Sequence, residues 1–314
     1  SSLVNINSSK SEKSNHKRIL LWVILVAIVW TLVFHDTISE YIFKNTEVID
    51  IIIPKESNGN SEEALKVYKQ AYELFQRDTY DSYLQSLNKT LKSLEINSRS
   101  YQSYVLLIDN YLSLWEVIRQ DSQNSSSLTI LMSKATELGA EAKTIQRLEA
   151  KYLMNQLRFD EGESKMLGNE SKDGESLQTL GIIAYFQNRF DPSMQYFKQA
   201  EGLIPHSPRN LYFTGLIYHL TGEYDKSVEA FLHNIKNHPL HALTSLELAI
   251  IEVESLGKVE QANMRLIELL KIKENLFPSK QALTYYYLGV TFDKMSQKDK
   301  AIKAFEEALA IIPD

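Results

Sequence analysis

The sequence predicts an all-α protein, a solenoid of helix-turn-helix hairpins preceded by one transmembrane helix. Two observations support this prediction. Residues 174–205, 208–239 and 282–313 carry the same residue types at the same steps, and the first two stretches start 34 residues apart. Residues 19–34 form an almost unbroken apolar run. A period of this length is typical of stacked helical hairpins, which form protein-binding surfaces more often than active sites.

Three columns of the repeat have physical roles, counted in steps from the start of each copy. Glycine at step 8 lets the first helix approach the second closely, and phenylalanine at step 24 forms an apolar plug. Proline at step 32 ends the second helix, because it lacks an N–H donor and clashes with the preceding turn. In the order of the copies these residues are Gly181, Gly215 and Gly289, then Phe197, Phe231 and Phe305, then Pro205, Pro239 and Pro313.

The copy that starts at residue 282 resembles a tetratricopeptide repeat. The residues on the signature steps of that family are Tyr285, Leu288, Gly289, Phe292, Ala301, Phe305, Ala308 and Pro313. The chain therefore resembles a tetratricopeptide repeat protein, which implies a right-handed superhelical solenoid. Serine replaces the alanine of step 20 at Ser193 and Ser227, and Asn234 replaces the alanine of step 27.

The resemblance weakens toward the N-terminus. We predict four repeats at residues 174–207, 208–241, 242–281 and 282–314, and degenerate hairpins of the same kind at 61–173. Polar stretches at 120–127 and 168–175 interrupt the pattern. An alternative is therefore two shorter superhelices joined near residue 170.

The apolar run at residues 19–34 contains Thr31 as its one polar residue. As a helix it would be roughly 24 Å long, somewhat short of a ~30 Å hydrocarbon core, and flanking residues extend it to 19–38. A buried core helix and a cleaved signal peptide are the alternatives. The run has no polar face, and the residues after it are not a small-x-small cleavage site, so we expect one uncleaved transmembrane helix in the lipid bilayer.

The basic residues next to this span predict its orientation. Lys10, Lys13, Lys17 and Arg18 precede the span, whereas fewer lysines follow it closely. The positive-inside tendency places residues 1–18, a disordered tail, in the cytoplasm and the repeats in the periplasm or another extracytoplasmic space. We therefore expect a single-pass inner (plasma) membrane protein.

A linker is expected at residues 39–60, between the span and the hairpins. It contains an apolar run at 48–53, which could be a short strand or the base of a juxtamembrane helix. The polar residues 55–61 after it are expected to form a flexible tether that lets the array tilt.

Few residue patterns point to chemistry. The chain has a net charge of -6 and no cysteine, and we expect no nucleic-acid partner, no cofactor and no catalytic residue. It lacks phosphate-binding glycine loops and the HExxH and GxSxG motifs. The densest histidine cluster spans residues 206–241. His238 and His241 lie three residues apart in the turn between two repeats, around Pro239, and no carboxylate stands at helical metal-ligand spacing beside them, so we predict no metal site.

The family resemblance implies that a partner would bind the concave face, which the first helix of each hairpin lines. These residues are Gln178, Ile182, Tyr185, Phe186, Arg209, Tyr212, Leu216, His219, Leu246, Ile250, Val253, Tyr286, Val290 and Asp293. Most are aromatic or aliphatic, so we expect an apolar helix or an extended peptide in this groove. Tyr212 and Leu216 occupy two steps at which relatives clamp a terminal carboxylate, which disfavours that ligand. The alternative is that a tight superhelix buries these side chains.

The last hairpin has no capping helix after it in this sequence. Solenoids usually end in a cap with a polar outer face. Either Ala301, Ile302, Phe305 and Leu309 lie far enough inward to need none, or this end self-associates or docks on another subunit.

We expect a non-enzymatic, membrane-anchored scaffold that mediates protein–protein interactions in a bacterial envelope assembly, such as a motility, secretion or cell-wall machine. The alternative is a targeting receptor that reads apolar or amphipathic peptide segments on the cytosolic face of an organelle. That alternative requires the opposite orientation.

Overall fold

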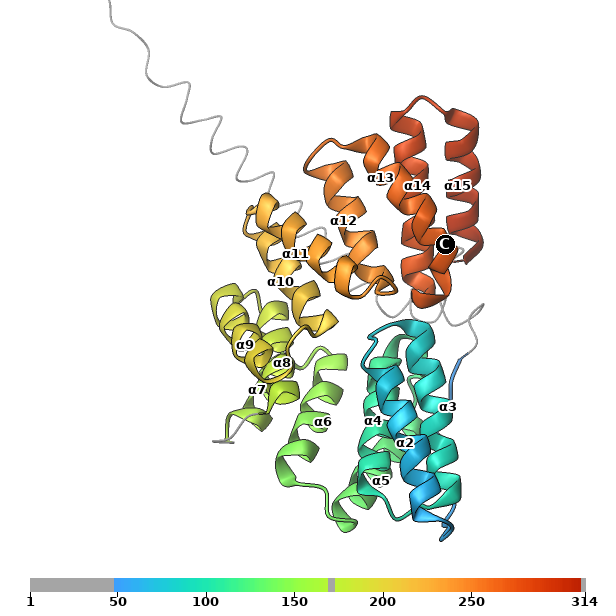
Figure 1. The fold of residues 1–314 in the computed structure, drawn as a ribbon, viewed down its shortest axis with the longest axis vertical. Helices are drawn as coiled ribbons and strands as arrows, with labels where there is room; N and C mark the ends of the chain where they lie inside the picture. Colours follow the sequence, from blue (N-terminus) through green and yellow to red (C-terminus); the bar gives the residue numbers. More distant parts are fainter. Residues whose placement is uncertain (1–47, 169–172, 312–314) are drawn as a thin grey trace, which may run out of the picture.

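The computed structural model describes residues 48–168 and 173–311. These ranges contain fourteen α-helices and two 3-10 helices, and the α-helices pair into seven hairpins (Figure 1). The helices are α2 (Ser61–Phe75), α3 (Tyr80–Ile96), α4 (Tyr101–Ser113), η1 (Trp115–Val117), α5 (Ser122–Glu137), α6 (Ala142–Asn155), α7 (Phe159–Leu167), α8 (Gly174–Phe186), α9 (Phe190–Leu203), α10 (Pro208–Leu220), α11 (Tyr224–Asn237), α12 (Ala242–Glu254), α13 (Val259–Leu269), η2 (Leu270–Asn275), α14 (Pro278–Lys294) and α15 (Lys298–Ile311). The described part of the chain is therefore an all-α solenoid.

Side-chain caps explain where several of these helices begin. Asn60 accepts hydrogen bonds from the backbone of Glu62 and Glu63 at the start of α2. Thr79 and Ser82 form a capping box at the start of α3. Asp121 caps α5, so the polar stretch 120–127 is mostly the first turns of a helix and not the expected break.

The glycines of step 8 and the phenylalanines of step 24 touch each other within each hairpin. A Cβ atom placed on Gly181 would lie 2.9 Å from the ring of Phe197, and one on Gly289 would lie 2.5 Å from the ring of Phe305. The pair at residues 215 and 231 is closer still. The two columns therefore form one packing contact, in which the missing side chain of glycine makes room for a buried phenylalanine ring.

Serine at step 20 is compatible with this close approach. Each serine hydroxyl donates to the carbonyl of the step-8 glycine on the facing helix. The distances are 2.7 Å for Ser193 to Gly181 and 2.8 Å for Ser227 to Gly215. The buried hydroxyls thus have acceptors, and the departure from alanine leaves no unpaired polar group.

Residues 48–60 run along the first two hairpins, so residues 55–60 of the predicted tether are docked and not free. Their path is extended, with isolated bridges from Ile49 to Ile118 and from Asn58 to Asn97. The Ile51 amide donates to Asn124 Oδ1 at 2.8 Å, and the Ile51 side chain is buried. Backbone hydrogen bonds and a buried isoleucine dock this segment onto the array.

The solenoid curves so that its two ends meet. The turn between α2 and α3 contacts the junction between η2 and α14: Thr79 Oγ1 donates to Asn275 Oδ1 at 3.2 Å. The rings of Tyr80 and Phe277 lie 4.8 Å apart. Phe277 packs against the apolar core of the first hairpins. In addition, α6 and α7 pack against α8. The hairpins before and after residue 170 therefore form one continuous array and not two separate superhelices.

No helix in residues 48–168 or 173–311 is long and apolar enough to cross a bilayer. The predicted tail 1–18 and span 19–38 lie outside the described residues, as do residues 39–47 of the predicted linker.

Candidate functional site: the inner face of the superhelix

The predicted concave-face residues differ widely in exposure. The buried ones are Gln178, Ile182, Leu246, Ile250 and Val253. The half-buried ones are Tyr185, Arg209, Tyr212, Leu216, His219 and Val290. The exposed ones are Phe186, Tyr286 and Asp293. A partner could reach only the second and third groups, and the binding role of all of them stays a prediction.

Tyr212 belongs to the packed interior of this face. Its ring lies 5.6 Å from that of His241 and 5.3 Å from that of Phe213. Its hydroxyl donates to Glu247 Oε1 at 3.3 Å. Burial raises the pKa of Tyr212 well above its usual value, and the nearby Glu247 carboxylate adds to the effect. Tyr212 therefore stays neutral and acts as a hydrogen-bond donor inside the array.

Phe186 is the accessible edge of an aromatic cluster. It stacks on Phe159, with 5.5 Å between ring centroids, and meets Tyr185 edge-on at 5.3 Å. Phe213 lies 6.4 Å away in the same geometry. Because 49% of Phe186 remains exposed, this cluster offers an apolar contact to solvent at the junction of α7, α8 and α10.

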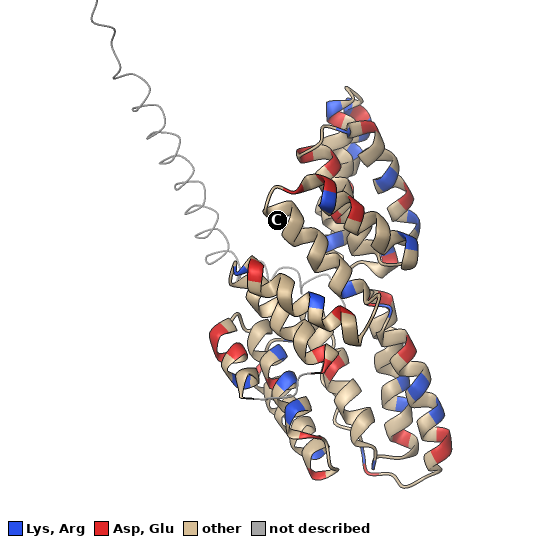
Figure 2. Cartoon of the chain, turned by 60° about the vertical axis from the view of Figure 1, so that its left-hand side comes forward, with Lys and Arg blue, Asp and Glu red and all other residues tan. Residues whose placement is uncertain are grey.

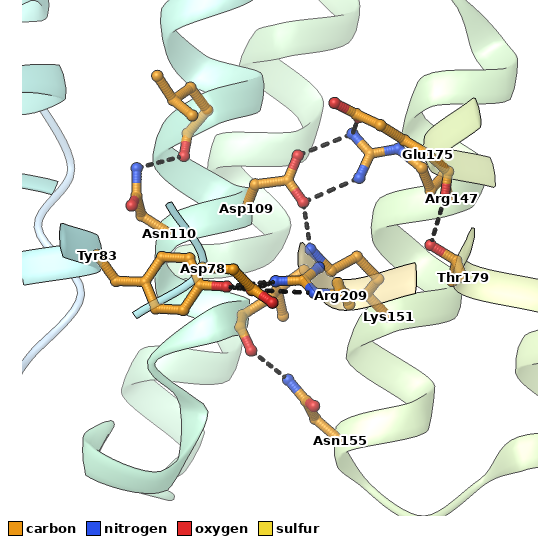
Figure 3. Close-up of polar contacts among 12 residues, drawn as sticks. Asp78, Tyr83, Asp109, Asn110, Arg147, Lys151, Asn155, Glu175, Thr179 and Arg209 are labelled. Carbon is orange, nitrogen blue, oxygen red and sulfur yellow. Dashed lines mark hydrogen bonds and ion pairs between the residues drawn. The ribbon is translucent and has the colours of Figure 1, made fainter. Parts of the chain in front are cut away.

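Charged residues of both signs are spread along the array (Figure 2). Three of them, Asp109, Arg147 and Lys151, are buried. Asp109 of α4 accepts two hydrogen bonds from Arg147 of α6, at 2.9 and 2.7 Å, and one from Lys151 at 2.5 Å (Figure 3). Arg147 also lies 3.0 Å from Glu175 of α8. Three successive inner helices are thus joined by ion pairs.

Burial and pairing oppose each other in this cluster. Burial alone would raise the pKa of the Asp109 carboxyl, but the Arg147 and Lys151 cations outweigh it and hold that pKa well below its usual range. Burial also lowers the pKa of the Lys151 ammonium, which the Asp109 carboxylate partly offsets. Asp109 is therefore the anion on which the cluster depends.

A second group of polar residues joins the first hairpin to α10 and α12. Arg209 Nε donates to Asp78 Oδ1 at 3.1 Å, and the Tyr83 hydroxyl contacts both groups (Figure 3). His241 Nε2 lies 3.3 Å from Asp78 Oδ2, and its Nδ1 lies 2.6 Å from Thr244 Oγ1. Although burial would raise the pKa of Asp78, Arg209 and His241 hold it below its usual range. These contacts hold the first hairpin against α10 and α12 and so close one turn of the superhelix.

The space between the two groups is a cavity of about 50 Å³, and Asp78, Asp109, Arg147, Lys151 and Arg209 are among its lining residues. A volume of this size holds a few water molecules and no peptide. This part of the inner face is therefore filled with paired charges, which differs from the apolar lining that was expected.

The sequence contained a signal for two of these residues. The clear repeat columns lie in the C-terminal copies, and the same register extends upstream. When step 12 is counted from residues 98 and 140, it gives Asp109 and Lys151. Arg147 falls on step 8, where the better copies have glycine, and no pattern in the sequence predicts its ion pair.

Histidines of the cluster at residues 206–241 form hydrogen bonds within the array. His238 Nε2 lies 2.6 Å from the carbonyl oxygen of His206, and His241 is buried against Asp78 and Thr244. Within the described ranges, no group of three or more histidine, aspartate or glutamate side chains is placed to hold a metal ion.

Comparison with known proteins finds matches to one family model and to two relatives. A family model described as tetratricopeptide repeat matches residues 282–314. The TPR repeat-containing protein MJ1428 of Methanocaldococcus jannaschii is 23% identical over 256 residues, which cover 78% of this chain and 38% of that protein. The probable UDP-N-acetylglucosamine–peptide N-acetylglucosaminyltransferase SPINDLY of Hordeum vulgare is 26% identical over 146 residues, 44% of this chain and 15% of that protein. The chain thus spans well under half the length of both relatives.

A solved structure described as "Crystal structure of APC/C hetero-tetramer Cut9-Hcn1" matches with a TM-score of 0.65 and 17% sequence identity. The match covers 78% of this chain and 46% of the other. At this identity the likeness concerns the fold. The repeat match at residues 282–314, the relative from M. jannaschii and the shared fold support a tetratricopeptide repeat protein.

Proposed function

We propose that this protein is a non-enzymatic scaffold that holds protein partners in an assembly at a membrane. Tetratricopeptide repeats indicate a scaffold for protein–protein interactions. The observation that carries the proposal is the closed array of seven hairpins, whose buried ion pairs join inner helices far apart in the sequence. A rigid body of this kind presents fixed surfaces, which lowers the entropy lost when a partner binds.

The membrane part of the proposal depends on the sequence of residues 19–38. The apolar run and the basic residues before it favour a single-pass anchor in the inner membrane, with the N-terminus in the cytoplasm and the repeats in the periplasm. A motility, secretion or cell-wall machine would then be the assembly that the scaffold serves.

The partner surface that we propose is the accessible part of the inner face. Phe186 is its main apolar contact, because it is half exposed and already supported from behind by Phe159 and Tyr185. Tyr286 extends the exposed aromatic surface in the last hairpin. An apolar helix or an extended peptide would bury these rings, as aromatic anchors do in other interfaces.

Affinity purification from the native host tests the scaffold and its surface. We expect Phe186→Ala to reduce recovery of at least one partner several-fold. The matched control is Leu232→Ala, which removes an equally exposed apolar side chain from the outer helix α11. Equal recovery with both variants would contradict the surface. A reporter fused after Asp314 tests the location, and activity in the cytosol alone would contradict a periplasmic array.

A further inference from the structure

The last hairpin carries an apolar groove that no described helix covers. It has a volume of about 400 Å³ and lies between α14 and α15. Its lining includes Ala282, Leu283, Tyr286, Phe305, Ala308 and Leu309. Tyr286 and Leu309 are each about half exposed, at 48% and 51%. Apolar surface of this kind, gathered in a groove, is typical of an interaction site.

The earlier hairpins show what occupies the equivalent groove. Phe197 and Phe231 stand at the step of Phe305, but they are 1% and 0% exposed. Ile217 of α10 packs in one cluster with Phe197, and Ile251 of α12 packs in one cluster with Phe231. In both hairpins an α-helix, the first of the next hairpin, covers the phenylalanine.

The covering helices contact the preceding hairpin through residues spaced i, i+4 and i+7. The buried residues at this spacing are Thr244, Leu248 and Ile251 in α12, and Thr284, Leu288 and Thr291 in α14. Hydroxyls on this face accept hydrogen bonds from asparagine side chains of the preceding hairpin. Asn234 donates to Thr244 at 2.8 Å, and Asn263 donates to Thr291 at 2.8 Å. In the last hairpin Ala308 stands at the step of Asn234, so its groove offers no amide donor at that step and fits a helix whose narrow face carries large aliphatic residues.

We propose that the groove of the α14/α15 hairpin binds an amphipathic α-helix of a partner protein. The helix presents leucine or isoleucine at positions spaced i and i+3, as Leu248 and Ile251 of α12 do against Phe231. The groove continues the interface that already joins each hairpin to the next, so the same geometry receives the partner. This inference rests on the proposed scaffold function and specifies one of its binding surfaces.

A second copy of this chain, stacked head to tail, does not fit the groove. The residues of α2 at the equivalent steps are Lys66, Gln70 and Glu73, all exposed. Placing two charged side chains and an amide against Phe305 and Leu309 would bury them without partners, which is costly. The chemistry of the groove thus favours a helix from another protein.

Fluorescence anisotropy with the full chain tests the proposal. The probe is a fluorescein-labelled peptide with the sequence of residues 242–254, because this helix carries the fitting face. We expect saturable binding that weakens about tenfold with Leu309→Gln in the chain. Ile302→Gln is the matched control, since Ile302 is 57% exposed on the same helix and does not line the groove. A control peptide with serine at both Leu248 and Ile251 should not bind.

Three results would overturn the proposal. The first is the absence of saturable binding, or equal affinity of the Leu309→Gln and Ile302→Gln chains. The second is a dimer in sedimentation velocity that Leu309→Gln dissociates, which would assign the groove to a second copy. The third is peptide binding only after removal of residues 1–47, which would assign it to the chain's own N-terminal segment. Partners that depend on Phe186 would still be recovered in each case, so the scaffold proposal is tested separately.

Discussion

The close contact between Gly215 and Phe231 predicts a destabilising glycine-to-alanine substitution inside a helix. In Gly215→Ala, the new Cβ would lie 2.6 Å from Phe231 Cδ1 and 2.8 Å from Cζ. Carbon atoms pack well at about 3.5–4.0 Å. The ring is 0% exposed and has no solvent to move into, so neighbouring helices must separate. Overpacking of this kind costs about 1–3 kcal/mol.

Gly202→Ala provides the matched control. Gly202 lies in α9, and a Cβ atom there meets nothing within 4 Å. Alanine is favoured over glycine in a helix by about 0.5–1 kcal/mol, and both substitutions gain this term. We therefore expect Gly202→Ala to stabilise the protein slightly. The difference in unfolding free energy between the two variants isolates the overpacking cost of about 1–3 kcal/mol.

Urea unfolding followed by circular dichroism measures this difference. Because a repeat array can open in parts, amide hydrogen exchange in α10 and α11 supplies a local reading of the same effect. Gly215→Ala should exchange faster there than the parent chain. If Gly215→Ala were as stable as Gly202→Ala, the Gly–Phe pair would not be the contact that sets the distance between the helices.

Three further predictions concern the polar contacts. Asp109→Asn should lower the unfolding free energy by about 3–5 kcal/mol, because it leaves Lys151 buried without its anion and Arg147 paired with Glu175 alone; a urea titration measures it. Since the pKa values of Asp78 and Asp109 are lower in the folded than in the unfolded chain, their stabilising contribution is present above the unfolded pKa of about 4 and is lost as the pH falls toward the folded values. Thermal midpoints measured from pH 7 to pH 3 should therefore fall at acid pH, and less steeply in an Asp78→Asn, Asp109→Asn chain. Asn124→Ala should speed hydrogen exchange at the Ile51 amide and proteolysis within residues 48–60; an unchanged exchange rate would contradict the docking of this segment.

The repeat columns predicted the hairpins because each column reflects a contact or a helix end within one hairpin. Glycine at step 8 and phenylalanine at step 24 meet in one contact within one hairpin, so residues that are close together in the sequence carry the signal. The helix starts at residues 174 and 208 are marked in the same way, by Asp173 and by Pro208. Local chemistry of this kind is readable from a sequence.

The inner face was harder to predict because its contacts join distant parts of the chain. Asp78 and Arg209 are 131 residues apart, and their pairing depends on how far the superhelix turns. Residues 55–61 were expected to be a tether because they are polar, yet Ser57 exchanges hydrogen bonds with Ser98 across two segments. The composition of a segment indicates whether its residues prefer solvent, but it does not identify the distant residues with which they form hydrogen bonds.

The superhelix closes on itself where the α2–α3 turn packs against the start of α14. Because the chain has no cysteine, a Tyr80→Cys, Phe277→Cys variant can be joined by a short bis-methanethiosulfonate reagent in the native state. We expect rapid cross-linking within one chain that is lost in urea, and no cross-linking for Tyr80→Cys paired with Ile302→Cys. Equal cross-linking of the two pairs, or none for residues 80 and 277, would contradict the closed array.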